Sequence, residues 1–289
     1  MTQSFDPRTT GVRHHVNGLT LHAIEAGPED GPLVILLHGF PEFWWGWRYQ
    51  IGPLAEAGFR VLVPDQRGYN LSDKPDGRRA YDLVILAKDV VGLADALGRD
   101  TFSLVGHDWG GLVAWWTASR YPDRVEKLVV LNAPHPAVAG SYMRSHPSQM
   151  LRSLYVGFFQ IPWLPDAMLS ANGYRSLKDA LQRTSRPGTF SDEDIAQYEK
   201  AWSQPGAVTT MLNWYRALPF KPDMKDPTVR APTLVIWGTG DRFLEKGLAE
   251  ASLALCKTGS ARWIESATHW VQHEEPEAVN AAMVAFLKP

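Results

Sequence analysis

One short stretch of the chain combines a reactive side chain with the small residues needed to present it, Gly106-His107-Asp108-Trp109-Gly110. Apolar stretches precede it at 102–105 and follow it at 111–118, so the motif stands between an expected buried strand and an expected helix. In the nucleophile-elbow pattern G-x-S-x-G the central position carries serine, whereas here it carries Asp108. Small residues at 106 and 110 permit the tight turn. The sequence therefore predicts a carboxylate nucleophile on a strand-turn-helix elbow.

A carboxylate at this position restricts the chemistry of the elbow. An oxygen of Asp108 that attacks an sp3 carbon forms an alkyl ester, and a second step, in which water attacks the aspartate carbonyl, must regenerate the free carboxylate. The expected electrophile is therefore an epoxide or a carbon–halogen bond rather than a carboxylic ester. The same chemistry requires a base that activates water, an acid that orients this base, and an oxyanion hole.

Two residues of the C-terminal part are candidates for the base and its orienting acid. His269 follows the last expected strand, about residues 262–265, and is the only histidine expected on a loop at that end of the sheet. Asp241 follows the strand before it and would fix the imidazole tautomer. Nucleophile, acid and base then occur in the chain order Asp, Asp, His. A solvated turn for Asp241 and a core histidine for His269 are the alternatives, and His273 is a rival base.

The oxyanion hole is expected from two backbone amides. His38-Gly39-Phe40-Pro41 lies just past an expected strand at 33–37, where elbow-type sites place their second amide. The N–H groups of Phe40 and Trp109 would hold the negative charge on the carbonyl oxygen of Asp108 during ester hydrolysis. An ordinary Gly-Pro turn is the alternative interpretation of the first segment.

Short apolar runs predict the sheet that positions these residues. They are nearly continuous rather than alternating, as in buried parallel strands, and they fall at 33–37, 61–64, 102–106, 128–131 and 233–237. Helical patterns lie between most of them, for example at 81–97. Residues 12–16 and 19–24, separated by Asn17-Gly18, predict a hairpin at the antiparallel edge. The expected fold class is α/β, with a mostly parallel, doubly wound sheet.

The strand pattern stops in the middle of the chain. Residues 136–229 are helical and aromatic in pattern, with Pro and Gly breaks, and they predict an inserted helical cap, or lid. Residues 1–135 and 230–289 would then form the core domain, which ends in a helix at 276–287.

Composition limits the partners of this chain of 289 residues. The formal net charge is −2 and no polybasic run occurs, so neither nucleic acid nor an anionic membrane is an expected partner. Cys256 is the single cysteine, which rules out an intramolecular disulfide, and residues 1–7 lack the character of a secretory leader. We expect a soluble, cytoplasmic protein with no metal and no organic cofactor, because no ligand cluster or phosphate loop occurs. Monomer and homodimer both remain open.

Tryptophan is unusually abundant, with 12 residues. Six of them cluster at positions 44, 45, 47, 109, 115 and 116. This clustering suggests a cavity lined by aromatic side chains, and a tightly packed core is the alternative.

Five segments resemble those of the soluble epoxide hydrolases of the α/β-hydrolase fold, and the resemblance extends over essentially the whole chain. They are His38-Gly39-Phe40-Pro41-Glu42, Asp65-Gln66-Arg67-Gly68-Tyr69, Gly106-His107-Asp108-Trp109-Gly110-Gly111, Asn132-Ala133-Pro134-His135-Pro136 and His269-Trp270-Val271-Gln272. The resemblance implies an α/β-hydrolase fold with a cap. It also implies an enzyme that opens a small epoxide to a vicinal diol through an ester on Asp108, with a role in detoxification.

The resemblance also implies two cap tyrosines that hold the epoxide oxygen and donate a proton as the ring opens. Tyr155, five residues before Gln160, resembles the first, and Tyr215, in Leu212-Asn213-Trp214-Tyr215-Arg216, resembles the second. An alkoxide needs a general acid to leave, whereas a halide does not, so two phenols favour an epoxide. For either tyrosine alone, packing is the alternative role. The residues expected to contact the apolar part of the substrate are Phe40, Trp109, Phe158 and Phe159.

Two other functions compete with this interpretation. Haloalkane dehalogenases share the Asp-Trp elbow. Fluoroacetate dehalogenases, which act on a haloacid, share the H-G-F-P motif. Against them, Phe40 has no side-chain donor for a halide, and the fluoroacetate enzymes have Arg where this chain has Trp109. A protein of this fold that binds a small ligand without turnover is the other alternative, although no catalytic part is missing. The chain departs from its relatives at Asn70 and Thr268, where Gly is frequent, and we expect only local loop changes there.

Overall fold

The computed structural model describes residues 10–220 and 224–288. The segment 1–7, on which the expected absence of a leader rests, lies outside the described residues. Among the helices that the described residues form, none combines the length and the apolar character that a membrane span requires.

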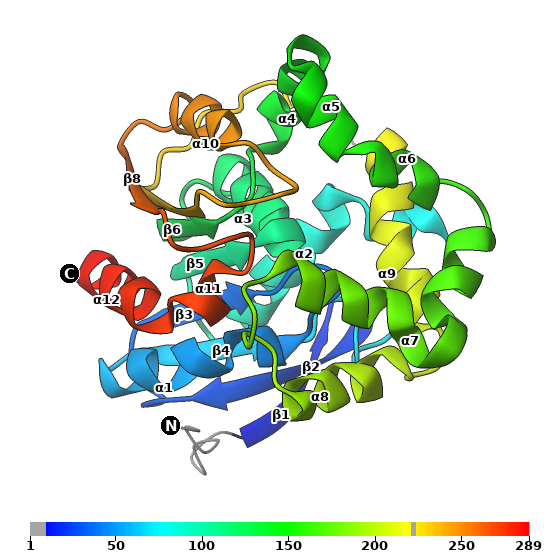
Figure 1. The fold of residues 1–289 in the computed structure, drawn as a ribbon. Helices are drawn as coiled ribbons and strands as arrows, with labels where there is room; N and C mark the ends of the chain where they lie inside the picture. Colours follow the sequence, from blue (N-terminus) through cyan, green and yellow to red (C-terminus); the bar gives the residue numbers. More distant parts are fainter. Residues whose placement is uncertain (1–9, 221–223, 289) are drawn as a thin grey trace.

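The described strands form one sheet of eight, in the order β1-β2-β4-β3-β5-β6-β7-β8 (Figure 1). Their bounds are β1 Thr10–Val16, β2 Leu19–Ala26, β3 Leu33–Leu37, β4 Arg60–Pro64, β5 Phe102–His107, β6 Val125–Leu131, β7 Thr233–Gly238 and β8 Gly259–Ile264. β2 pairs antiparallel with both β1 and β4, and every other pairing is parallel. The predicted α/β class and the antiparallel hairpin edge are confirmed. The last strand begins three residues earlier than we expected.

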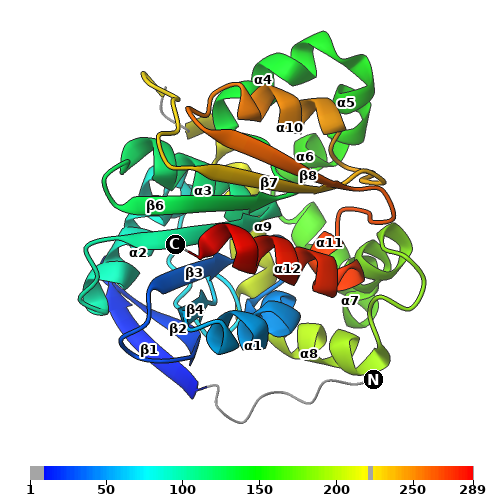
Figure 2. The same ribbon diagram turned by 90° about the vertical axis from the view of Figure 1, so that its left-hand side faces the viewer.

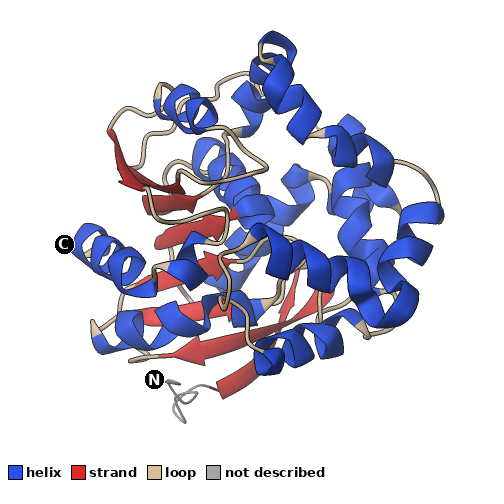
Figure 3. Ribbon diagram, viewed as in Figure 1, coloured by secondary structure: helices blue, strands red, loops and turns tan. Residues whose placement is uncertain are grey.

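Helices alternate with the strands in the first and last parts of the chain (Figure 3). In the part of the chain that the structure describes, they are η1 Trp44–Trp47, α1 Arg48–Glu56, η2 Arg78–Tyr81, α2 Leu83–Ala96, α3 Asp108–Arg120, α4 Pro136–Ser145, α5 Pro147–Arg152, α6 Leu154–Phe159, α7 Leu164–Thr184, α8 Asp192–Trp202, α9 Ala207–Arg216, η3 Leu218–Phe220, α10 Lys246–Leu253, α11 Val271–Glu274 and α12 Pro276–Leu287. The helix predicted at 81–97 starts at Leu83. The Asp82 side chain caps this helix, because it accepts hydrogen bonds from the backbone amides of Val84 and Ile85.

Each face of the sheet buries its own set of side chains. Ile35 and Leu37 of β3 belong to the apolar cluster that includes residues of α2 and α3, whereas Val34 and Leu36 belong to the cluster that includes residues of α1 and α12. Figure 2 shows α1 and α12 in front of the sheet. Because successive residues of a strand point to opposite faces, a sheet covered on both sides needs apolar residues throughout, which explains the continuous runs in the sequence.

The residues between β6 and β7 form helices α4 to α9 and η3 in the described chain. Helices α6, α7 and α9 gather beyond one end of the sheet (Figures 1 and 3), whereas α8 lies close to the start of α1, where Asp194 and Arg48 form an ion pair of 2.9 Å. We call residues 136–229 the cap segment. The division of the chain into a core at 1–135 and 230–289 and a cap at 136–229 stays a prediction.

Candidate active site

The elbow is a sharp turn between β5 and α3. β5 ends at His107, and Asp108 opens α3 with a φ of 50°, a left-handed conformation that only a constrained turn holds for a non-glycine residue. A Cβ atom at Gly106 would lie 2.3 Å from the carbonyl oxygen of Gly110, and one at Gly110 would lie 2.2 Å from the carbonyl oxygen of Leu37. Only glycine fits at both places, and this is the physical reason for the small residues on either side of Asp108.

The carboxylate of Asp108 reaches the loop that follows β3. The amide of Phe40 donates a hydrogen bond of 2.8 Å to Oδ1 of Asp108, which is the contact expected of an oxyanion-hole amide. Gly39 makes this approach possible, since a Cβ atom there would lie 2.5 Å from Cβ of Asp108. Trp109, the second predicted donor, follows Asp108 in the first turn of α3, and its part in the oxyanion hole stays a prediction.

His269 and Asp241 lie in contact on the other side of the carboxylate. Nδ1 of His269 is 2.7 Å from Oδ2 of Asp241, and its Nε2 is 3.6 Å from Oδ2 of Asp108. The Asp241 carboxylate also accepts the side-chain amide of Asn132 at 2.7 Å and the backbone amide of Phe243 at 2.7 Å. Burial alone would raise the pKa of Asp241, but the charge of His269 and the hydrogen bonds from His269, Asn132 and the Leu244 amide hold the pKa below its usual value.

The protonation of His269 depends on both carboxylates. Burial opposes the charged imidazolium, yet the negative charges of Asp241 and Asp108 and their hydrogen bonds outweigh burial and raise the pKa of His269 to about 10. The imidazole is therefore protonated at neutral pH as long as Asp108 is a carboxylate. Neutralising Asp108 would remove part of this stabilisation.

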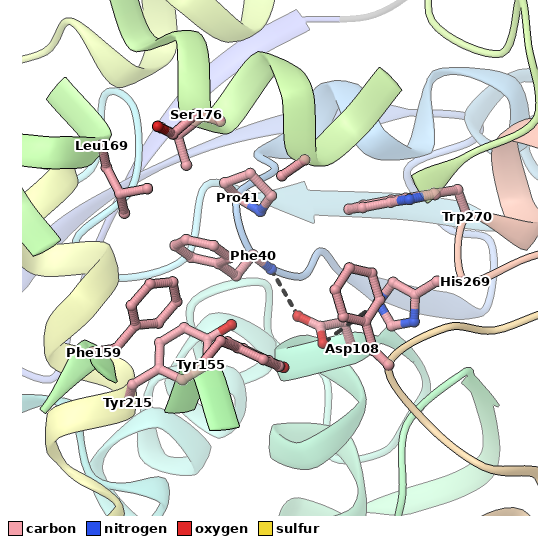
Figure 4. Close-up of a pocket in the computed structure, with 13 residues that line it drawn as sticks. Phe40, Pro41, Asp108, Tyr155, Phe159, Leu169, Ser176, Tyr215, His269 and Trp270 are labelled. Carbon is pink, nitrogen blue, oxygen red and sulfur yellow. Dashed lines mark hydrogen bonds and ion pairs between the residues drawn. The ribbon is translucent and has the colours of Figure 1, made fainter. Parts of the chain in front are cut away.

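These side chains border a cavity of about 220 Å³ between the sheet and the cap segment (Figure 4). Its lining is mostly apolar and consists of Phe40, Pro41, Asp108, Tyr155, Phe159, Leu169, Ser176, Leu177, Ala180, Tyr215, Phe243, His269 and Trp270. Figure 4 shows Asp108 linked to Phe40 and His269, with Tyr155 and Tyr215 together on the side away from His269. The cavity thus brings the predicted nucleophile, base and both tyrosines to one small space.

The two tyrosines come from α6 and α9 and touch each other, with their ring centroids 6.0 Å apart. Burial first, and then the negative charge of nearby Asp108, raise the pKa of Tyr155. Burial, the neighbouring Tyr155 and Asp108 hold the pKa of Tyr215 far above its usual value, against a hydrogen bond from the Trp109 side chain. Both phenols are therefore neutral and keep a proton to donate towards the cavity.

The predicted substrate-contacting residues divide into two groups. Phe40 and Phe159 line the cavity as expected. Phe158 does not: it is half-buried and packs against Phe159, because neighbouring residues of a helix point in different directions. The side chain of Trp109 lies behind Tyr215, with ring centroids 4.9 Å apart, instead of lining the cavity.

The tryptophan cluster lies outside the cavity lining as well. Trp47, Trp115 and Trp116 are buried in the packed interior, as the alternative interpretation had it. The tryptophan that does line the cavity is Trp270, next to the predicted base. The cavity is lined by aromatic side chains, as we expected, but apart from Trp270 these are phenylalanines and tyrosines, and the clustered tryptophans do not line it.

Several lining residues were missed by the sequence analysis. Leu169, Ser176, Leu177 and Ala180 all belong to α7, which forms one wall of the cavity. Their spacing is interrupted by non-helical backbone at residues 171–174, so no helical periodicity joins Leu169 to the others. Proximity in sequence was the only available signal for Trp270 and for Phe243, which stand one and two residues from the predicted base and acid.

His273, the rival base, lies in a separate buried cluster. Its Nε2 is 2.6 Å from Oε1 of Glu42, and its Nδ1 is 2.9 Å from Nη1 of Arg48. It does not border the cavity that holds Asp108, in the part of the chain that the structure describes. His107 also bonds the carboxylate of Glu42, and its Nε2 lies 2.9 Å from the carbonyl oxygen of His269. This cluster therefore holds the backbone of the predicted base in place.

Both departures from the related sequences are explained locally. Asn70 adopts a φ of 38°, a conformation that suits glycine and that asparagine also tolerates, and its side chain donates to Asp65 at 2.8 Å. Thr268 donates both its amide and its hydroxyl to the carboxylate of Glu274. Both residues are thus accommodated by contacts near their own loops, and the expectation that only these loops differ from those of relatives stays a prediction.

Comparison with known proteins places this fold and site in a family. Residues 32–276 match the family described as "alpha/beta hydrolase fold". The chain is 46% identical over 275 residues to the AB hydrolase superfamily protein YfhM of Bacillus subtilis, with 95% of this chain and 96% of that protein covered. The chain therefore belongs to the α/β-hydrolase fold family.

Its relatives within the family include epoxide hydrolases. The chain is 41% identical to epoxide hydrolase 4 of Homo sapiens over 283 residues, which cover 96% of this chain and 78% of that protein. The crystal structure of Bacillus megaterium epoxide hydrolase in complex with an inhibitor superposes with a TM-score of 0.88 at 31% identity, covering 96% and 99% of the two chains. The chain belongs to the branch that holds these epoxide hydrolases, which confirms the resemblance inferred from its motifs.

Proposed function

We propose that this protein is an epoxide hydrolase that converts an epoxide to a vicinal diol through a covalent ester on Asp108. The observation that carries the proposal is one cavity shared by a carboxylate nucleophile, a histidine base and two neutral phenols. The relatives named above support it. The largely apolar lining favours an uncharged, apolar epoxide, because no cationic side chain other than His269 borders the cavity among the described residues.

Ring opening uses the cap tyrosines and one oxygen of the nucleophile. Tyr155 and Tyr215 donate hydrogen bonds to the epoxide oxygen, and one of them gives its proton to the developing alkoxide. Oδ1 of Asp108 is held by the amide of Phe40 at 2.8 Å and remains the carbonyl oxygen. Oδ2 is therefore the atom that attacks the ring carbon, and the product of this step is a hydroxyalkyl ester.

Ester hydrolysis uses His269 and Asp241. Formation of the ester removes the negative charge of Asp108, which lowers the pKa of His269 and releases its proton. The proton released by His269 replaces the one that the tyrosine gave to the alkoxide. Neutral His269, oriented by Asp241, then removes a proton from water, and this water attacks the Asp108 carbonyl carbon while the amides of Phe40 and Trp109 stabilise the oxyanion. The tetrahedral intermediate collapses by breaking the bond between the carbonyl carbon and Oδ2, which leaves with the diol. The second proton of the attacking water passes to this leaving oxygen, so Asp108 returns as a carboxylate and His269 as the imidazolium.

The same contacts disfavour halide as the leaving group. The side chain of Trp109 does not line the cavity among the described residues, and Phe40 offers only a backbone amide, which is bonded to Asp108. Two phenols aimed at the cavity would protonate an alkoxide and have no such role with a halide.

The decisive experiment is a single turnover of enzyme in excess over styrene oxide in 18O-labelled water. Label should enter the Asp108 peptide and be absent from the diol, because the new hydroxyl comes from Oδ2 and the water oxygen stays on Asp108. His269→Gln should accumulate the ester as a mass increase on the Asp108 peptide. His15→Gln, the same substitution at an exposed histidine of β1, is the matched control and should turn over normally.

Two outcomes would overturn the proposal. Label found in the diol after one turnover would mean that water attacks the epoxide directly. Absence of diol together with halide release from a panel of haloalkanes and haloacids would keep Asp108 as the nucleophile and assign the protein to the dehalogenases.

A further inference from the structure

Helix α5 of the cap segment forms hydrogen bonds with the loop that carries the predicted acid, Asp241. This acid loop, residues 241–245, follows β7 and bears Asp241 at its start and Phe243 at its centre. Gln149, on α5 of the cap segment, is only 2% exposed and does not border the cavity. Nε2 of Gln149 donates a hydrogen bond of 2.8 Å to the carbonyl oxygen of Phe243, and Oε1 accepts one of 2.9 Å from the backbone amide of Glu245. Both ends of the Gln149 amide group therefore bond the acid loop, and the nitrogen also donates to Oγ of Ser153 at 3.0 Å.

The segment held by Gln149 is the one that orients the acid. Oδ1 of Asp241 accepts the backbone amides of Phe243 at 2.7 Å and of Leu244 at 3.0 Å. These two donors belong to the same short stretch of backbone that Gln149 bonds at residues 243 and 245. If residues 243–245 move, the Asp241 carboxylate loses both donors to Oδ1, and the position of its Oδ2 against His269 changes with them.

Other contacts of the same helix and loop act in the same direction. Arg152, one helical turn after Gln149, donates to the carbonyl oxygen of Asp241 at 2.8 Å. The ring of Phe243 lies 5.2 Å from the imidazole of His269 and 5.9 Å from the ring of Tyr155, between centroids. The acid loop therefore lies between α5 on one side and the side chains of His269 and Tyr155 on the other.

We infer that Gln149 is a positioning residue that couples the cap segment to the hydrolytic half of the reaction by fixing the acid loop beneath His269. This inference rests on the proposed two-step function. Gln149 touches neither the cavity nor Asp108, so it has no direct part in ring opening. Its loss should therefore slow hydrolysis of the ester and leave formation of the ester intact.

The test separates the two half-reactions in Gln149→Leu, which keeps the approximate size of the side chain and removes both hydrogen bonds to the acid loop, together with the one to Ser153. Rapid-quench mass spectrometry follows the Asp108 ester with styrene oxide in excess. Alkylation should stay within about twofold of the wild-type rate, whereas ester hydrolysis should fall about tenfold, the factor that corresponds to about 1.4 kcal/mol of lost transition-state stabilisation. Gln204→Leu is the matched control, because the amide of Gln204 bonds the carbonyl oxygen of Lys200 in its own segment. It should change neither rate.

Two further measurements keep the test independent of folding. Gln149→Glu keeps the acceptor for the Glu245 amide and loses the donor to Phe243, so the same split between the half-reactions is expected in a second variant. The downfield proton resonance of the hydrogen bond between His269 and Asp241 should shift or broaden in both variants and stay unchanged in Gln204→Leu.

The possible failures are distinguishable. Hydrolysis at the wild-type rate in both Gln149 variants, with an unchanged proton resonance, would overturn the positioning role while leaving the ester mechanism standing. An equal loss in both half-reactions would show that Gln149 serves only general stability of the fold. A wild-type protein that forms no ester on Asp108 would instead refute the proposed function itself.

Discussion

The charge on Asp108 should control whether His269 is able to act as a base. In the free protein the pKa of His269 is raised to about 10, with Asp108 as one of the causes. The substitution Asp108→Asn keeps the carbonyl oxygen that the Phe40 amide bonds and removes the negative charge, as ester formation does. We therefore use this variant to represent the electrostatics of the ester state.

The magnitude follows from the distance between the two groups. Nε2 of His269 lies 3.6 Å from Oδ2 of Asp108. Unit charges at that separation interact by about 4 to 5 kcal/mol at an effective dielectric constant of about 20. Each pH unit corresponds to about 1.4 kcal/mol, so loss of the charge should lower the pKa of His269 by up to about three pH units, while Asp241, the larger cause of the raised pKa, stays in place. Neutral imidazole would then be abundant at physiological pH only after the ester has formed.

The assay is an NMR titration of 15N-labelled histidine in the wild-type protein and in Asp108→Asn. Asp95→Asn, at a carboxylate that is 59% exposed in its side chain, is the control and should leave His269 unchanged. Because the site is built to hydrolyse a carbonyl at position 108, peptide mass spectrometry must verify that the asparagine persists. A pKa of His269 within about one pH unit of wild type in Asp108→Asn would refute the electrostatic gating of the base.

Three further predictions concern the proton donor Tyr215, the close approach of Gly39 to the nucleophile Asp108, and the buried ion pair of Arg67 with Asp89. Tyr215→Phe should slow alkylation about a hundredfold and spare ester hydrolysis, as rapid-quench rates will show; an equal loss in both steps would contradict its role as acid. Gly39→Ala places a Cβ atom 2.5 Å from Cβ of Asp108, so kcat/KM should fall about a hundredfold with an unchanged circular dichroism spectrum, and near-normal activity would count against the close approach of the two segments. Arg67→Met removes the two hydrogen bonds of 2.6 Å that the Arg67 guanidinium donates to the buried Asp89 carboxylate, and it should lower the free energy of unfolding by about 3 to 5 kcal/mol in urea denaturation; a loss below about 1 kcal/mol would disprove this.

The sequence by itself determined the elbow, the order of the acid and base, and the sheet beneath them. Gly106 and Gly110 are required by close backbone contacts at the turn itself, so the motif carries its own geometry. The strands are recognisable because both faces of the sheet are covered, which makes every position apolar. Such local requirements are written into neighbouring residues, and a single sequence reveals them.

Only the tertiary structure decided what surrounds the predicted nucleophile. The cavity wall made by α7 and the absence of Phe158 from the cavity lining depend on how the cap helices pack against the core, whereas Trp47 and Trp115 of the tryptophan cluster are buried among residues of the core. The contact of Gln149 with the acid loop joins residues 94 positions apart, and no local pattern encodes such a pair. Packing between distant segments is settled by the fit of whole surfaces, and that is why the chemistry was predictable from short motifs while the shape of the binding site was not.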